Sequence, residues 1–248
     1  PYYVLGRGSN VLAHDDGFRG AIIFTQEMSG FERDGNTLFA LSGTNITSLS
    51  REAGRMGLSG LEFACGIPGS VGGAVMMNAG AYGGEIKDIL KKCRVYLPDR
   101  AEILELDNES CDFSYRHSVF EENGGIIISC EFLLTPDSPE KIKDREEDLL
   151  ARRRDKQPLE YPSAGSAFKR PEGYFAAKLI EDAGLKGCSF GGAAVSEKHS
   201  GFVINKGDAT SENVVTLLSH IKSEVAEKFG VELSCEIRYL SPKGEERI

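Results

Sequence analysis

The chain has 248 residues, 40% of them hydrophobic and 27% charged, with a formal net charge of −9. This length favours two domains over one. The acidic balance argues against nucleic acid or an anionic membrane as the main partner, so an anionic ligand would depend on local Arg and Lys. No apolar run approaches the roughly 18 residues of a membrane span, and no signal peptide is visible, so a cytoplasmic location is expected.

The six cysteines are scattered without a CxxC pair, and the four histidines do not cluster. This pattern favours reduced thiols over a disulfide framework and predicts no metal site. Cys65, beside a glycine-rich segment, is interpreted as a packing residue because no basic partner lies near it in sequence.

The first candidate binding element is Gly6-Arg-Gly-Ser-Asn10, here called the amino-terminal turn, which lies between two short apolar runs. Its flanks indicate a strand, a tight turn and a second strand. It begins like a dinucleotide fingerprint, but the third glycine is absent and a loop follows it, which excludes a Rossmann unit. From these residues alone, a phosphate-binding loop and a plain hairpin turn are both open.

Short strands and turns alternate over residues 1–135. A helix is predicted over residues 44–56, with Ile46, Leu49, Ala53 and Met56 on one face and Gly57 as its stop. The clearest predicted strands are 21–25, 37–41, 95–97 and 126–134.

Seven glycines lie in the segment Gly66–Gly84, here called the cofactor loop. Glycine costs backbone entropy, so the run is hard to justify as a helix or an ordinary strand. Its apolar residues argue against a flexible linker. Backbone that approaches a large ligand closely is the better interpretation, because exposed N–H groups bind phosphate oxygens.

A helix is predicted to start at Ser138-Pro139 and to end near Arg152–Arg154, and the domain boundary is placed in the following stretch, which Pro158 interrupts. Periodicity then predicts the elements of the second domain. They are a helix with apolar residues from 175 to 183 that ends at Gly184, a strand at 202–205, a helix over 214–229 that ends at Gly230, and a strand at 231–240 with strict alternation.

Together these segments resemble the MurB family of UDP-N-acetylenolpyruvoylglucosamine reductases. The resemblance covers nearly the whole chain in one order. Its motifs are Gly6–Asn10, Gly57–Phe63, Gly66–Gly73, Met77–Tyr82, Tyr115–Ser118, Lys156–Pro158, Pro162–Pro171, Gly173–Gly184, Val195–His199 and Glu236–Arg238.

The resemblance implies an α+β flavoprotein with two domains. Residues 1–157 would form an FAD-binding domain of the vanillyl-alcohol-oxidase (PCMH) type, from which an amino-terminal segment is expected to be missing, and 158–248 a smaller α+β substrate domain. FAD is the implied cofactor, and NADPH and an enolpyruvyl UDP-N-acetylglucosamine are the implied substrates of a monomer. An oxidase of the same flavin fold and a non-catalytic flavin or sugar-nucleotide binding module are the alternatives.

The family's catalytic positions match three residues. Ser166 corresponds to the proton donor, Arg116 to the arginine that polarises the substrate carboxylate, and Glu236 to the catalytic glutamate. Such groups suit a reaction that builds carbanion character beside a carboxylate. From local sequence alone, a turn serine, a surface ion pair and a solvated strand residue are the alternative readings.

The resemblance also implies the binding residues. For the cofactor these are Gly6, Arg7, Gly8, Ser9, Asn10, Gly66, Ile67, Pro68, Gly69, Ser70, Gly72, Gly73, Asn78 and Ala79. For the substrate they are Arg153, Lys156, Lys169, Arg170 and His199, with a solvated helix end or a structural histidine as the alternatives.

Two departures from the family pattern are visible. Ala194 stands where many members have a larger, often polar residue. The interval from Arg116 to Ser166 is short, as in the subclass that lacks an extra substrate-covering tyrosine loop, so no such tyrosine is assigned.

Overall fold

The computed structural model describes all residues 1–248, which divide into two compact units. Unit 2 comprises Val4–Gly8 and Ile22–Arg153, and unit 1 comprises Pro1–Tyr3, Ser9–Ala21 and Arg154–Ile248. The amino-terminal turn is therefore divided between the units after Gly8. The predicted boundary after residue 157 lies near this change of unit, and the assignment of whole domains remains a prediction.

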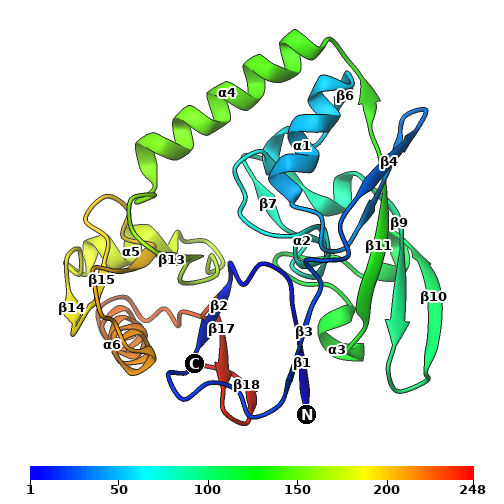
Figure 1. Ribbon diagram of the computed structural model, residues 1–248. Helices are drawn as coiled ribbons and strands as arrows, with labels where there is room; N and C mark the ends of the chain where they lie inside the picture. Colours follow the sequence, from blue (N-terminus) through cyan, green and yellow to red (C-terminus); the bar gives the residue numbers. More distant parts are fainter. The chain divides into compact units, whose positions relative to one another are not determined.

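Unit 2 is built on a five-stranded antiparallel sheet in the order β10-β9-β11-β5-β4 (Figure 1). Alternate residues of β5, among them Leu38 and Ala40, are fully buried, as the half-buried strand pattern predicts. In the order of the sheet the strands are Glu102–Asp107, Leu90–Leu97, Ile126–Leu133, Thr37–Leu41 and Phe31–Asp34.

Helix α1 (Ile46–Arg55) covers part of this core and confirms the helix predicted over 44–56. Its start is capped by Asn45, whose side chain accepts a hydrogen bond from the Ser48 N–H. It ends before Gly57, which has a φ of 71° and so takes the left-handed conformation typical after a helix.

The remaining elements of unit 2 are short. There are two short helices, α2 (Val71–Met76) and α3 (Phe120–Asn123). There are also three 3₁₀ turns, η1 (Glu62–Ala64), η2 (Ile86–Asp88) and η3 (Glu109–Cys111). Two small antiparallel pairs are β6 (Leu58–Ser59) with β12 (Thr135–Pro136), and β7 (Gly80–Ala81) with β8 (Gly84–Glu85).

Helix α2 corrects the expectation that the cofactor loop avoids helical structure. It contains Gly72 and Gly73 and is capped by Ser70, whose Oγ accepts from the Gly73 N–H at 3.3 Å. Tertiary packing overrides the low helix propensity of glycine here, because a Cβ on Gly72 would lie 2.9 Å from the Ser42 Cβ.

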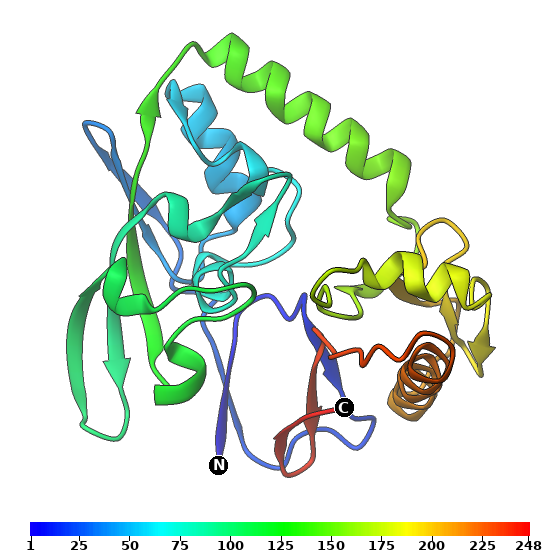
Figure 2. The ribbon, with the colours of Figure 1, turned by 180° about the vertical axis from the view of Figure 1, so that it is seen from behind.

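Unit 1 contains a four-stranded antiparallel sheet, β13-β16-β15-β14, and the helices α5 and α6 (Figures 1 and 2). Most of the predicted apolar residues of both helices are buried in one core, but Phe175 and Phe229 at the helix ends are exposed. The predicted strand 202–205 is confirmed. In the order of the sheet the strands are β13 (Ser163–Ser166), β16 (Phe202–Asn205), β15 (Ala193–Val195) and β14 (Ser189–Phe190). The helices are α5 (Ala176–Asp182) and α6 (Ser211–Phe229).

The predicted strand over 231–240 is wrong in its extent, because regular pairing begins only at β17 (Arg238–Ser241). Residues 234–236 are hydrogen-bonded to 167–169, whereas β17 pairs with β2 (Val11–Ala13) and β18 (Gly244–Glu246). Figure 2 shows β17 between these two partners. The apolar and polar residues do alternate over 231–240. The segment changes its hydrogen-bonding partner along its length, however, and this change interrupts the strand ladder.

The two strands beside the amino-terminal turn do not pair with each other. β1 (Tyr2–Leu5) pairs with β3 (Ala21–Phe24), and β2 runs parallel to β17. A plain hairpin turn was therefore the wrong alternative for residues 6–10. Helix α4 (Pro139–Lys156) begins at the predicted Ser138-Pro139 signal. No helix of the chain is both long and apolar enough to cross a membrane.

Candidate active site

The glycine at position 6 allows the amino-terminal turn to touch the start of α2 in unit 2. A Cβ built on Gly6 would lie 2.3 Å from the Ser70 Oγ, so no larger residue fits without a shift. The hydroxyl of Ser70 is fixed in turn, because it caps α2. The structure thus brings together two segments that are 64 positions apart and that the sequence assigned to one cofactor.

A loop between β5 and α1, residues 42–45, packs against the cofactor loop. Its Gly43 is irreplaceable on steric grounds, since an added Cβ would lie 1.8 Å from the Thr25 backbone oxygen. Sequence analysis missed this loop, although a glycine between a strand and a helix cap was a signal for it. Three backbone hydrogen bonds connect the two loops: Gly72 N–H to Ser42 O, Val71 N–H to Thr44 O, and Ile46 N–H to Gly69 O.

These bonds decide which amides could hold an anionic cofactor. The N–H groups of Val71, Gly72 and Gly73 already have acceptors within the protein. The N–H groups of Gly69 and Ser70, and those of Gly6 and Gly8 in the same unit, have no protein acceptor. Unpaired backbone donors on closely packed glycine segments fit the diphosphate of FAD. The glycines of α2 contribute close packing instead of free amides.

The segment that contains Arg116 is fastened to the cofactor loop. Arg116 has a φ of 55° and donates from Nη2 to the Gly80 backbone oxygen at 3.1 Å. The hydroxyl of Ser118 donates to the Met76 backbone oxygen at 2.7 Å. The Tyr115 ring lies 5.1 Å from the guanidinium carbon of Arg116 and helps to orient it.

Asn78 completes this attachment and is fully buried. Its Nδ2 donates to the Ser114 backbone oxygen at 3.0 Å and to the Glu85 carboxylate at 2.8 Å, and its Oδ1 accepts from the Lys87 N–H. Both of its donors are used within the protein. The side chain of Asn78, which the sequence assigned to the cofactor, therefore holds the Arg116 segment in place.

Arg153 lies against the cofactor loop from α4. A Cβ on Gly66 would lie 2.9 Å from its Cδ, and burial lowers the pKa of its guanidinium. Its neighbour Arg152 is instead paired with Asp148 at 2.8 Å. Of the two arginines, Arg153 is thus the one without an ion pair and the better candidate for an anionic ligand.

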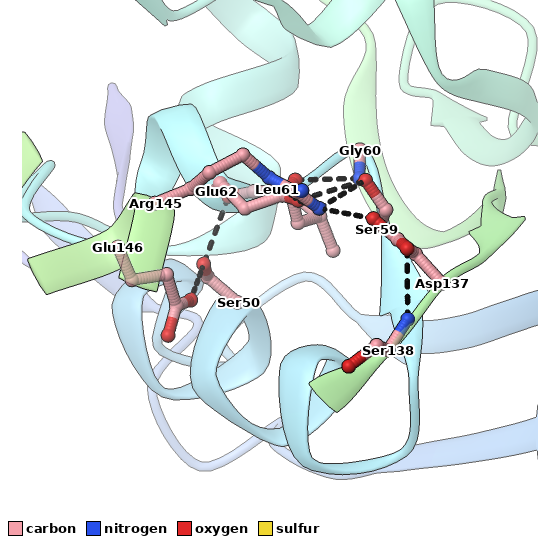
Figure 3. A network of polar contacts seen from close by, with 9 residues as sticks. All are labelled: Ser50, Ser59, Gly60, Leu61, Glu62, Asp137, Ser138, Arg145 and Glu146. Atoms are coloured by element: carbon pink, nitrogen blue, oxygen red, sulfur yellow. Dashed lines mark hydrogen bonds and ion pairs between the residues drawn. The ribbon is translucent and has the colours of Figure 1, made fainter. Parts of the chain in front are cut away.

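A polar network anchors α4 just before the cofactor loop (Figure 3). Arg145 donates to the Glu62 carboxylate at 2.8 Å and to the Asp137 carboxylate at 2.7 Å. Burial acts to raise the pKa of Glu62, but hydrogen bonds from the Gly60 N–H, the Ser59 hydroxyl and Arg145 outweigh it, and the pKa lies below its ordinary value.

The same helix carries a buried carboxyl group, Glu146, beside Ser50 (Figure 3). Burial raises the pKa of Glu146 despite the hydrogen bond from Ser50. Cys65 lies next to this helix with its Sγ 3.7 Å from the Glu146 backbone oxygen, and burial raises the pKa of Cys65 to about 11. Burial thus disfavours the thiolate form, as is typical of a packing residue.

In unit 1, Ser166 and Glu236 lie on neighbouring segments. Ser166 is exposed at the end of β13, and the next residue, Ala167, accepts a backbone hydrogen bond from the Glu236 N–H at 2.9 Å. A second bond joins the Lys169 N–H to the Ser234 oxygen at 2.8 Å. The structure therefore brings together two of the three predicted catalytic residues, which are 70 positions apart in sequence.

Ser9 and Asn10 belong to unit 1, unlike the glycines that precede them. The Asn10 Nδ2 donates to the backbone oxygen of Glu236 at 3.0 Å, and the Asn10 backbone oxygen accepts from the Arg238 N–H at 3.0 Å. Asn10, which the sequence assigned to the cofactor, thus contacts the Glu236 segment on both sides of residue 237.

The predicted substrate-binding residues of unit 1 differ in how they are held. Lys156 and Lys169 lie at least partly exposed. The Arg170 guanidinium stacks 3.9 Å from the centre of the Phe175 ring, which orients it. Burial lowers the pKa of His199, whose Nδ1 accepts from the Gly201 N–H, so its ring is neutral with the proton on Nε2. Ala194 is fully buried and pairs with Ile204 across the sheet.

Two family models match the chain. Residues 1–107 match an FAD binding domain, and residues 157–240 match the C-terminal domain of UDP-N-acetylenolpyruvoylglucosamine reductase. These ranges leave the intervening part, with Arg116 and Arg153, to the relatives that span the whole chain.

Curated relatives carry the same reductase name. A UDP-N-acetylenolpyruvoylglucosamine reductase of Clostridium novyi is 49% identical over 99% of this chain and 80% of its own length. One of Clostridium botulinum is 50% identical over 99% of this chain and 79% of its own length. The crystal structure of UDP-N-acetylenolpyruvylglucosamine reductase (MurB) from Thermus caldophilus is similar with a TM-score of 0.85 and 36% identity, covering 96% of this chain and 85% of that one.

Proposed function

The chain belongs to the family of UDP-N-acetylenolpyruvoylglucosamine reductases, and from this premise we infer its reaction, substrates and catalytic residues. It is an FAD-dependent oxidoreductase of peptidoglycan precursor synthesis, with an α+β FAD-binding domain of the vanillyl-alcohol-oxidase type and the C-terminal domain of the reductase. The observation that carries the inference is the agreement over nearly the whole chain with relatives of one activity.

We propose that the substrate is the enolpyruvyl ether of UDP-N-acetylglucosamine, that NADPH is the reductant, and that the product is UDP-N-acetylmuramate. The names of the relatives support this assignment. We further propose that the enzyme acts as a cytoplasmic monomer, where both nucleotides are available to it.

When bound, FAD would supply the hydride chemistry that links NADPH to the methylene carbon of the enolpyruvyl group. We propose that the unpaired backbone amides of Gly6, Gly8, Gly69 and Ser70 bind its diphosphate. The contact between Gly6 and Ser70 supports this proposal, because it brings the two glycine segments close together in unit 2.

Hydride addition leaves carbanion character beside the substrate carboxylate. The proposed catalytic residues would stabilise this negative charge and protonate the carbon. Arg116 would hold the carboxylate, for which its planar fork is suited, and its bond to Gly80 fixes the guanidinium. Ser166 would donate its hydroxyl proton to the carbanionic carbon. Glu236 lies on the segment bonded to Ala167, which supports a joint role with Ser166 in the protonation.

The substrate diphosphate needs cations in a chain of net charge −9. We propose Arg153, Lys156, Lys169 and Arg170 for this task. The contact of Arg153 with the cofactor loop and the stacking of Arg170 on Phe175 support it, since both fix a guanidinium in advance. His199, neutral and half-buried, would supply a hydrogen-bond donor from Nε2.

The test is a spectrum of the purified chain reconstituted with FAD, followed by its two half-reactions. We expect flavin absorption that NADPH bleaches under anaerobic conditions and that the enolpyruvyl sugar nucleotide restores with formation of the muramate product. Bleaching followed by rapid reoxidation with oxygen alone would identify an oxidase, and flavin binding without bleaching a non-catalytic module. Either result would contradict the proposal.

A further inference from the structure

Asn10 is held in a position that its place in a glycine-rich turn does not predict. Glycine turns of this type bind cofactors through backbone amides, yet the Asn10 side chain is directed to the protein itself. Its Nδ2 donates to the Glu236 backbone oxygen at 3.0 Å, across 226 positions of sequence. Its backbone oxygen also accepts a hydrogen bond from the Arg238 N–H at 3.0 Å.

Together with a third hydrogen bond, these bonds hold the backbone on both sides of Glu236. Its N–H donates to the Ala167 oxygen, next to Ser166, and its C=O accepts from Asn10. Both backbone polar groups of Glu236 are therefore fixed, one by the Ser166 segment and one by Asn10. Regular pairing with β2 begins only at Arg238, so residue 236 lies outside that strand ladder.

We propose that Asn10 is a positioning residue for Glu236, and that it acts in the oxidative half-reaction through this backbone clamp and not through the cofactor. The proposal rests on the proposed function only for the role of Glu236. Loss of the amide removes this partner of the Glu236 oxygen and lets the segment rotate, so that the carboxylate is displaced from its working position.

The variants are Asn10→Ala, which deletes the amide, and Asn10→Asp, which keeps its size but turns an oxygen toward the Glu236 carbonyl. Asn108→Ala is the matched control. Its Nδ2 also donates to backbone oxygens, those of Lys87 and Leu90 at 2.7 Å, but within unit 2. All chains are reconstituted with FAD and compared by circular dichroism and thermal unfolding.

Kinetics then separate a positioning role from cofactor binding. We expect both Asn10 variants to retain FAD and to be reduced by NADPH at a rate within about twofold of the unsubstituted chain. The limiting rate of reoxidation by the enolpyruvyl substrate should fall about tenfold or more, since a misplaced acid–base group loses a large share of its effect. The control should leave both rates unchanged.

A double-variant cycle shows whether Asn10 acts through Glu236. If it does, Asn10→Ala combined with Glu236→Gln should reoxidise no more slowly than Glu236→Gln alone, because the group that was positioned is already lost. Additive losses, or loss of FAD from the Asn10 variants, would overturn the proposal. Failure of both variants to fold would overturn it too, because the residue would then be structural.

Hydrogen exchange tests the clamp without any turnover. Peptides that cover residues 231–240 should exchange faster in Asn10→Ala than in the unsubstituted chain, and peptides of α6 should not change. Unchanged exchange at 231–240 would contradict the clamp itself. Faster exchange in a chain that NADPH cannot reduce would instead contradict the proposed function and leave the clamp standing.

Discussion

Ser166 is the residue whose replacement we expect to separate the two half-reactions most cleanly. It is exposed at the end of β13, where its hydroxyl can reach a ligand. In Ser166→Ala we expect flavin reduction by NADPH to be nearly unchanged and reoxidation by the enolpyruvyl substrate to slow by about 10²–10⁴-fold, because only the second step needs its proton. Stopped-flow absorption of the flavin measures both rates.

The matched control for this prediction is Ser163→Ala, at the other end of the same strand and also exposed. It should leave both rates unchanged. An equal decrease of both half-reactions in Ser166→Ala would show that the hydroxyl is not the proton donor.

Gly6 tests the contact between the two glycine segments. In Gly6→Ala the new methyl group would meet the Ser70 hydroxyl at 2.3 Å, so we expect weaker FAD binding and a stability loss of about 1–3 kcal/mol, as for overpacked cores. Fluorescence titration with FAD and urea unfolding measure the two effects.

The same contact offers a rescue. Ser70→Ala added to Gly6→Ala removes the hydroxyl and leaves a Cβ separation of 3.4 Å, so FAD affinity should recover in part. Ser70→Ala alone should cost only the helix cap, about 1 kcal/mol. A double variant that binds FAD no better than Gly6→Ala would show that this contact does not limit binding.

The sequence indicates which residues carry chemistry better than it indicates what each one touches. The family resemblance was enough to select Gly6 and Ser70, which the structure places in contact. It could not show that the side-chain amide of the buried Asn78 donates both of its hydrogen bonds within the protein. Nor could it show that Asn10 donates to the Glu236 backbone oxygen. Those assignments depend on burial and on partners 36 and 226 positions away, which one sequence does not encode locally.

Among the elements, α1 and α6 were predictable because periodicity and capping agree. In α6, Leu217, Leu218, Ile221 and Val225 are buried at helical spacing, Thr210 caps its start, and Gly230 ends it with a φ of 66°. The predicted strand 231–240 failed because alternation gives no sign of a change of partner. Helix α2 was missed because packing against Ser42, and not propensity, decides its conformation.

Helix α4 supplies a prediction about pH. The Ser50 Oγ lies 2.8 Å from both the Leu61 oxygen and the Glu146 Oε1, but one hydroxyl proton can serve only one of them. A protonated Glu146 resolves this conflict, since its own O–H can then donate to Ser50. Burial likewise raises the pKa of Glu146 above its unfolded value of 4.5.

The direction of the pH effect follows from proton binding. Between the unfolded pKa and the raised folded pKa, the native state binds more protons, so stability falls as pH rises through this window. Glu146→Gln should remove this slope and stabilise the protein above the folded pKa, by about 1.4 kcal/mol for each unit of pKa difference. Urea unfolding between pH 4.5 and 8 measures it, and an unaltered slope in Glu146→Gln would contradict a raised pKa.

At the scale of the whole molecule, the chain has two hydrophobic cores and places the predicted groups in both. One core contains the five-stranded sheet, α1 and α2, and the other contains α5, α6 and the four-stranded sheet. The cofactor loop, Gly6 and Arg116 belong to unit 2, whereas Ser166 and Glu236 belong to unit 1. The groups predicted to bind the cofactor and those predicted to donate a proton therefore lie in separately packed cores.

This division predicts an uneven response to FAD. A ligand that binds only the folded state stabilises it by about 2.7 kcal/mol at a concentration of 100 times its dissociation constant. Because the unpaired amides of Gly6, Gly8, Gly69 and Ser70 lie in unit 2, hydrogen exchange at β5 and β11 should slow more than at β16 and α6 when FAD is added. In Gly6→Ala this difference should shrink. Equal protection of both cores would show that the glycine segments of unit 2 are not the main site of cofactor binding.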